Sequence, residues 1–172
     1  KYCQQTATSS YKRSKGETQY DRGHLVPANH FDGSKQSINQ TNFMSNILPQ
    51  AANMNRGAWL QTEEIVECYR DIEPLDIWGG VIWGDNADDD HFVKSHGVKT
   101  PDAFWKVIVR GDRGIAWIIP NTPDAKRRKL DKYLVSIEEI EALAGLNFDI
   151  PADQKSKPRS SSWSIPKGCD KG

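Results

Sequence analysis

The pattern of hydrophobic and polar positions is irregular at the start of this 172-residue chain and becomes strand-like after it. Residues 1–19 are polar and lack a sustained period, which predicts a loop or an extended N-terminal arm. Residues 23–27 are β-biased, and Pro27 confines them to a strand end or a sheet edge. Residues 29–41 have the composition of a surface loop. A second extended run at 42–47 stops at Leu48 and Pro49 and can pair with the first as a hairpin.

The spacing then becomes helical between residues 54 and 69. At about 100° per residue, Asn55, Trp59 and Glu63 step along one side of this helix, with Asn55 and Glu63 about 80° apart in projection. One helix face can therefore present both polar groups. The apolar positions at helical spacing are Ala58, Trp59, Ile65, Val66 and Tyr69.

Three later segments predict a sheet. Residues 75–83 and 105–109 have the composition of buried strands, and residues 115–119 form a third strand after a hairpin turn at 111–114. An acidic loop at 85–90 lies between the first two strands.

The last predicted element is a short helix with clear ends. Ser136 and Glu139 make a capping box, so a helix is expected over residues 137–144, ending at Gly145. The tail from Pro151 is irregular. Without an internal repeat or a linker, we expect one domain over residues 1–172.

The composition is that of a globular protein, with 37% hydrophobic and 27% charged residues. The formal net charge is zero, so the molecule has no general attraction for polyanions and any nucleic-acid contact must be local. Basic clusters occur at 12–15, 126–129 and 155–159, although charge runs are usually solvated surface. No apolar run approaches the roughly 18 to 20 residues of a membrane span, which argues against a membrane protein.

Three cysteines match no zinc-binding spacing. Cys3 and Cys169 lie near opposite ends of the chain, where a disulfide would close a long loop. The odd number leaves Cys68 over. This pairing would favour an oxidising compartment.

Four polar residues suit phosphodiester hydrolysis, which needs a deprotonated water and neutralised phosphate oxygens. His24 titrates near neutrality and can be the general base. Asn55 can bind Mg²⁺ through its side-chain oxygen, because this ion keeps most of its waters and needs few protein ligands. Glu63 would support the hydrated ion without binding it, and Arg22 would clamp the phosphate charge. Taken singly, each residue also has an ordinary structural explanation as a turn cap, a helix cap or an exposed side chain.

Taken together, these residues resemble the DNA/RNA non-specific endonucleases of the ββα-metal (His-Me) type, which include secreted sugar-non-specific nucleases and the endonuclease G type. The resemblance lies in Asp-Arg-Gly-His at 21–24, Ser-Asn-x-x-Pro-Gln at 45–50, Asn-x-Gly-Ala-Trp at 55–59, and Glu63. It implies an α+β fold with a central antiparallel sheet, a ββα finger over about residues 20–70, and flanking helices.

The resemblance also implies an activity: Mg²⁺-dependent cleavage of single- and double-stranded DNA and RNA to 5′-phosphate ends, with Mn²⁺ as a substitute ion. It gives His24, Asn55, Glu63 and Arg22 the roles described above and adds Asn46 as a polar residue of the site. A protein inhibitor is an expected partner. The expected location is secreted or extracytoplasmic, with mitochondria as the alternative. The candidates for nucleic-acid contacts are Arg56, Lys126, Arg127 and Arg128.

One feature of the family is missing from its usual place. A further catalytic arginine is expected well upstream of residues 21–24, where this chain offers only Arg13. Either Arg13 or Arg56 substitutes for it, or the chain is a processed piece that needs an additional N-terminal segment. The alternatives in function are a catalytically silent nucleic-acid-binding relative and a nuclease of narrower substrate range.

Overall fold

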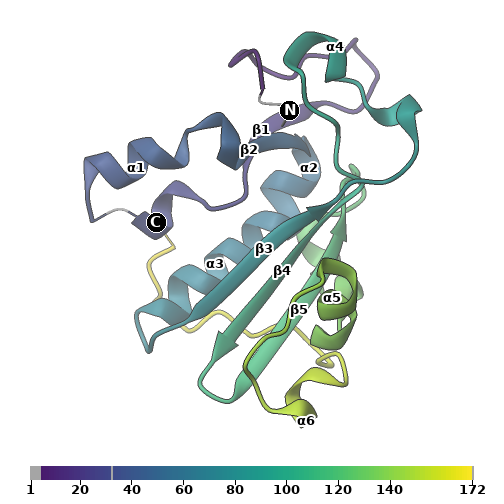
Figure 1. Ribbon diagram of the computed structural model, residues 1–172. Helices are drawn as coiled ribbons and strands as arrows, with labels where there is room; N and C mark the ends of the chain where they lie inside the picture. Colours follow the sequence, from purple (N-terminus) through teal and green to yellow (C-terminus); the bar gives the residue numbers. More distant parts are fainter. Residues whose placement is uncertain (1–4, 32, 172) are drawn as a thin grey trace.

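The computed structural model describes residues 5–31 and 33–171, in which a four-stranded antiparallel sheet lies between two helical layers (Figure 1). The strand order is β3-β4-β5-β6. The predicted turn between the two long strands is confirmed, and Gly111 in it has a φ of 56°, which favours glycine. The strands are β3 (Asp76–Ile82), β4 (Ala103–Arg110), β5 (Arg113–Pro120) and β6 (Leu134–Val135).

Alternate residues of β4 face opposite helices, as the period of a strand requires. Phe104 and Ile108 belong to a core with α3 (Leu60–Arg70), whereas Trp105 and Val107 belong to a second core with α5 (Ile137–Ala144). The central strand β4 is therefore buried on both faces. This explains why β4 reads as an almost continuous apolar run.

The predicted hairpin and following helix are confirmed, but both strands are shifted, and the first ends at His24 and does not reach Pro27. β1 (Tyr20–His24) pairs antiparallel with β2 (Ile47–Ala51), so β2 begins where the sequence predicted its end and runs through Pro49. A two-stranded ladder leaves alternate N–H groups of each strand unpaired, and proline is tolerated at such a position. The helix starts at α2 (Ala52–Met54) and continues through a π-helical turn, Asn55–Trp59, into α3.

The prediction of a loop over 29–41 is wrong. A 3-10 turn at Ala28–Phe31 is followed by α1 (Lys35–Thr41), where the Ser34 hydroxyl accepts from the Ser37 amide at 3.0 Å. This helix is polar and short, so it has no hydrophobic period from which to predict it. A 3-10 turn at Met44–Asn46 fills part of the run expected as strand.

The predicted strand at 75–83 is present as β3, but it is not buried. It forms an edge of the sheet, and its Ile77 is 40% exposed. The predicted helix at 137–144 is confirmed as α5, with its capping box and with Gly145 in the left-handed region.

The tail is irregular apart from α6 (Ala152–Lys155), and its Trp163 and Ile165 pack on the α3 core. None of the helices in residues 5–31 and 33–171 has the length and apolar character needed to cross a bilayer. The remaining short helices are η4 (Ala87–Asp89), α4 (Val93–His96) and η5 (Arg127–Tyr133).

Candidate active site

A cleft of about 240 Å³ between β1 and the long helix brings the predicted residues together. Arg22 and His24 alternate along β1, and Asn55 and Glu63 come from the π-turn and α3. The cleft is lined by Arg22, His24, Pro27, Ala28, Asn55, Arg56, Leu60 and Glu63.

His24 is held at both its backbone and its ring. Its carbonyl accepts hydrogen bonds from the Trp59 indole at 3.1 Å and the Gln50 amide at 3.3 Å. The ring Nε2 lies 3.3 Å from Oδ1 of Asn42, whose amide nitrogen already donates to the Ile38 carbonyl. Nε2 is therefore the donor in this pair, which leaves Nδ1 as the basic nitrogen.

The surroundings keep the His24 ring neutral. Burial lowers its pKa below the usual 6.5, the bond to Asn42 raises it, and the nearby Arg22 charge lowers it again. A neutral imidazole can accept a proton at physiological pH, which is what a general base requires. The sequence did not identify Asn42 as part of the site, because that residue was expected in a strand.

Gly23 is required by a close approach. A Cβ atom there would lie 2.1 Å from the side chain of Gln50, which is fully buried and bonds to the His24 carbonyl. A larger residue at position 23 would displace Gln50 and release the His24 backbone.

Asn55 lies inside the helix and does not cap it. Its amide nitrogen donates to Asp21 at 2.9 Å, which leaves the amide oxygen as the atom available to a ligand. Asp21 also accepts two bonds from Arg56, at 2.8 and 2.6 Å. Asp21 thus fixes the orientation of the proposed metal ligand, a role that the sequence motif alone did not reveal.

The π-turn changes the geometry expected for the helix. A π-turn inserts an extra residue into the helical pattern, so a uniform step of about 100° does not apply across Asn55–Trp59. Asn55 and Glu63 nevertheless line the same cleft. Burial raises the pKa of Glu63, whereas the nearby Lys106 charge and a hydrogen bond from Trp59 lower it, and Glu64 raises it.

Asn46 lies beside the cleft and does not line it. Its amide oxygen accepts from the Val26 amide at 3.0 Å, and its amide nitrogen donates to the carbonyls of Val26 and Thr41 at 2.8 Å each. The side chain is therefore committed to the backbone that follows His24. These bonds suit a positioning role, and a catalytic role for Asn46 stays a prediction.

The predicted basic contacts are distributed unevenly. Arg56 lines the cleft with a side chain 72% exposed, whereas Arg13 lies in a separate surface hollow beside Glu17. Of the two arginines proposed as substitutes, Arg56 is thus the one at the cleft. Lys126, Arg127 and Arg128 lie at the start of η5, and the backbone there packs closely on Gly57 of the π-turn.

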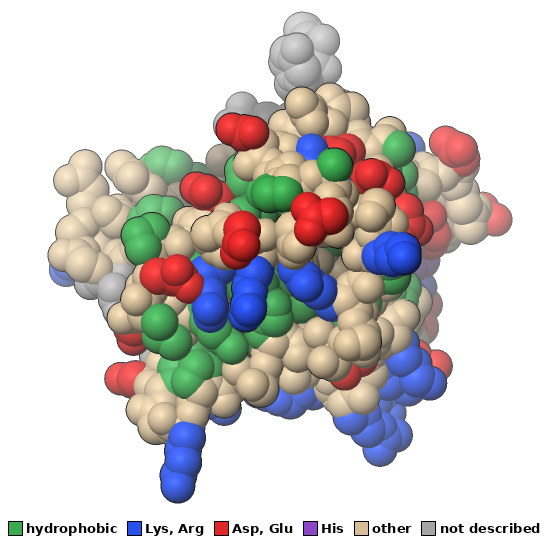
Figure 2. All heavy atoms as spheres, turned by 90° about the horizontal axis from the view of Figure 1, so that it is seen from below, with side chains coloured by type: hydrophobic (Ala, Val, Ile, Leu, Met, Phe, Trp, Pro, Cys, Tyr) green, Lys and Arg blue, Asp and Glu red, His purple; other side chains and the backbone are tan. Residues whose placement is uncertain are grey.

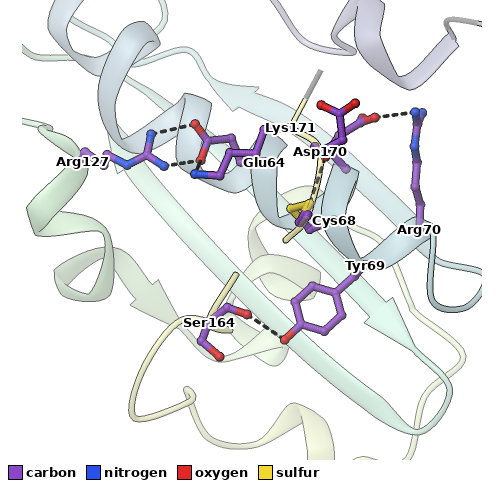
Figure 3. Close-up of a disulfide and its surroundings, with 10 residues drawn as sticks. Glu64, Cys68, Tyr69, Arg70, Arg127, Ser164, Asp170 and Lys171 are labelled. Atoms are coloured by element: carbon purple, nitrogen blue, oxygen red, sulfur yellow. Dashed lines mark hydrogen bonds and ion pairs between the residues drawn. A yellow bond between two sulfur atoms is a disulfide. The ribbon is translucent and has the colours of Figure 1, made fainter. Parts of the chain in front are cut away.

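Basic charge is partly neutralised at this surface. Arg127 pairs with Glu64, which also lies 3.4 Å from Lys171 (Figure 3). Charge is also mixed on another side of the molecule, the one seen from below Figure 1, where basic and acidic side chains lie next to each other around a hydrophobic area (Figure 2). This agrees with a formal net charge of zero.

The predicted Cys3–Cys169 disulfide is wrong. Cys169 is bonded to Cys68 of α3, with a Cα–Cα distance of 5.5 Å, and Cys3 lies outside the described residues. The tail runs along α3, where the Tyr69 hydroxyl donates to the Ser164 carbonyl at 2.9 Å (Figure 3). Closeness to the two chain ends was therefore a poor guide to the partner.

The motifs, the ββα finger and the cleft define the fold class of the ββα-metal nucleases. The DNA/RNA non-specific endonuclease family matches residues 1–155, and the chain belongs to this family. Its fold is the α+β fold expected from the sequence.

Among individual relatives, the chain is 29% identical over 155 residues to mitochondrial endonuclease G of Homo sapiens, covering 83% of this chain and 51% of that protein. It is also 29% identical to a nuclease of Serratia marcescens, covering 88% of this chain and 61% of that protein. The chain thus spans about half the length of the first of these relatives.

A solved structure also has this fold. The crystal structure of the EndoG/EndoGI complex, which describes the mechanism of EndoG inhibition, matches with a TM-score of 0.65 and 25% identity. The match covers 87% of this chain and 66% of that one.

Proposed function

We propose that this protein is a metal-dependent endonuclease that hydrolyses DNA and RNA with little sequence preference and leaves 5′-phosphate ends. The observation that carries the proposal is the single cleft in which Arg22, His24, Asn55 and Glu63 meet. Lack of preference follows if the enzyme reads mainly the phosphate backbone.

The donor set fits Mg²⁺. Asn55 offers an oxygen whose position is fixed through Asp21, and Glu63 offers a carboxylate in the same cleft that can accept hydrogen bonds from the waters of the ion without binding it. Mg²⁺ needs only one or two protein oxygens besides water and phosphate, and Mn²⁺ accepts the same ligands. When bound, the ion would neutralise charge on the phosphate oxygens.

The protein groups divide the remaining work. His24, with Nε2 held by Asn42, takes a proton from the attacking water at Nδ1. The carboxylate of Glu63 accepts hydrogen bonds from water and keeps it oriented. Arg22, supported by Arg56 at the other side of the cleft, stabilises the charge that develops on the phosphate.

The test compares the wild-type chain with His24→Ala on supercoiled plasmid and on total RNA, with Mg²⁺ and with EDTA. Loss of a general base should reduce cleavage by about 10²- to 10⁴-fold, and the melting temperature should change little. EDTA should stop cleavage of both substrates by the wild type. If neither protein cleaves but both shift nucleic acid in a gel, the domain is a binding module or needs a further segment.

For location we propose a secreted or extracytoplasmic protein with residues 1–172 as one nuclease domain. The Cys68–Cys169 disulfide supports an oxidising compartment, since disulfides rarely persist in reducing ones. Mitochondria remain the alternative, because several relatives are mitochondrial by name. A protein inhibitor is an expected partner.

Mass analysis of the native protein with and without reductant tests the disulfide, and the absence of a mass change would contradict the location.

A further inference from the structure

Lys106 on β4 is a buried charge that the proposed mechanism does not use. It is 2% exposed and pairs across the sheet with Gly79 of β3 and Trp117 of β5. Its Nζ atom has no hydrogen-bond partner in the described part of the chain. A buried ammonium without a hydrogen bond is costly and needs an explanation.

Lys106 contacts a side chain that is hydrogen-bonded to His24 in the cleft. Its Nζ lies 3.9 Å from the centroid of the Trp59 ring, within the range of a cation–π contact. Trp59 is fully buried, and its indole N–H donates to the carbonyl of His24. Lys106 therefore contacts the side chain that holds the backbone of the proposed general base.

The same charge acts on Glu63. The positive charge of Lys106 opposes the effect of burial on the pKa of Glu63, and Glu63 in turn favours the charged form of Lys106. The ammonium thus lies against Trp59, which bonds to the His24 backbone, and its charge acts on Glu63, which lines the cleft.

The charge does not stabilise the fold. Burial lowers the pKa of Lys106 from 10.5 to about 8 against the raising effect of Glu63, so the ammonium still predominates at neutral pH but is less favoured in the folded protein than in water. An apolar side chain of similar length would fill the same space without that cost, and such replacements of buried charges are often stabilising. Packing alone would therefore favour methionine at this position.

We propose that Lys106 is a positioning residue of the nuclease site: its buried ammonium holds the Trp59 indole and the Glu63 carboxylate in the arrangement that hydrolysis requires. This inference rests on the proposed function. It explains why a charge is retained in the core at the expense of stability, as is common at functional sites.

The test replaces Lys106 with methionine and measures kinetics and melting together. Loss of a supporting group of this kind typically lowers activity by about 10- to 100-fold, and we expect it in kcat with KM for DNA nearly unchanged. The melting temperature should rise by about 2–4 °C, the shift expected in a protein of this size for a modest gain in stability. A purely structural lysine would instead lower both stability and activity.

A matched control comes from the next residue. Val107 is fully buried but belongs to the core on the opposite face of the sheet. Val107→Ala should lower the melting temperature and leave kcat unchanged, which shows that modest destabilisation alone does not reduce the rate.

Chemical rescue separates charge from packing. A cavity of about 410 Å³ adjoins Lys106 and is lined also by His30, Val66, Leu75, Ile77 and Gly79. In Lys106→Ala, propylammonium added to the solution can enter this space, so activity should recover by about 10-fold, a part of the loss expected for a supporting group. Propanol has the same length without the charge and should not restore activity.

Two results would overturn the inference: full kcat in Lys106→Met, or equal rescue by propanol and propylammonium. These outcomes differ from failure of the proposed function, in which the wild-type chain itself shows no metal-dependent cleavage.

Discussion

The two faces of the central sheet have cores of different chemistry. Towards α5, Trp105, Val107 and Ile140 belong to an apolar cluster. Towards α3, the interior also contains Lys106, beside Trp59 and close to Glu63. The α5 face can therefore optimise packing alone, whereas the α3 face also has to position polar groups. We infer that stability depends on both faces but chemistry on only one.

The largest expected effect is that of Asn55→Ala, a change on the α3 side that should reduce activity without reducing stability. Loss of the amide oxygen removes the proposed metal ligand, so we expect cleavage to fall by at least about 100-fold and more Mg²⁺ to be needed for half-maximal rate. The melting temperature should change little. Activity titrated against Mg²⁺ checks this, and an unchanged Mg²⁺ requirement would exclude Asn55 as the ligand.

The counterpart on the other face is Ile140→Ala. Ile140 is fully buried in α5, so its truncation should cost about 2–5 kcal/mol of unfolding free energy. The kcat of the folded fraction should stay at the wild-type value. A loss of kcat in the folded fraction of this variant would show that the α5 side of the sheet also contributes to the chemistry.

The sequence predicted α5 better than the long helix, and the reason is physical. The ends of α5 are set by local groups, Ser136 with Glu139 at the start and Gly145 at the end, and these are visible in the sequence. The long helix begins without a side-chain cap and contains a π-turn, both of which depend on packing against distant residues such as Ala125.

The site could be predicted in part for the same reason. Arg22, His24, Asn55 and Glu63 were identified from a dense motif, and the structure places them in one cleft. The groups that orient them are contacts between distant segments: Asn42 lies 18 residues from His24 in sequence, and Asp21 lies 34 from Asn55. Neither spacing alone signals a contact.

Removing the disulfide tests how much the attachment of the C-terminal tail to α3 contributes to the stability of the protein. Cys68 and Cys169 are 101 residues apart, so Cys169→Ser should lower the free energy of unfolding by about 2–5 kcal/mol, since the unfolded chain loses a long constraint. Denaturant unfolding measures the loss. The matched control is Cys3→Ser, which should have little effect. Equal losses in both variants would restore the Cys3–Cys169 pairing.

Sensitivity to acid should also arise on the α3 side. The pKa of His30 is lowered from 6.5 to about 4, mainly by burial and then by the nearby Lys106 charge. Above pH 6.5 both folded and unfolded states are neutral at this residue, so it contributes no pH dependence. As pH falls below 6.5 the unfolded state binds the proton first, and stability is lost until about pH 4.

The expected loss from His30 is about 2 kcal/mol at pH 5, from 1.36 kcal/mol per pH unit. Unfolding free energies of the wild type and His30→Gln, measured from pH 7 to pH 5, check this through the difference in slope. Parallel pH profiles would show that His30 does not cause the acid sensitivity.

The smallest expected effect lies at the start of α5. The Ser136 hydroxyl accepts from the Glu139 amide at 3.2 Å, and the Glu139 carboxylate accepts from the Ser136 amide at 2.8 Å. Ser136→Ala should cost about 1 kcal/mol, and Glu139→Ala somewhat less. Because the two side chains also bond to each other at 2.9 Å, the double variant should lose less than the sum of the single losses. Additive losses would mean that the cap acts as two independent bonds, and any change in kcat would show that the α5 face is coupled to the cleft after all.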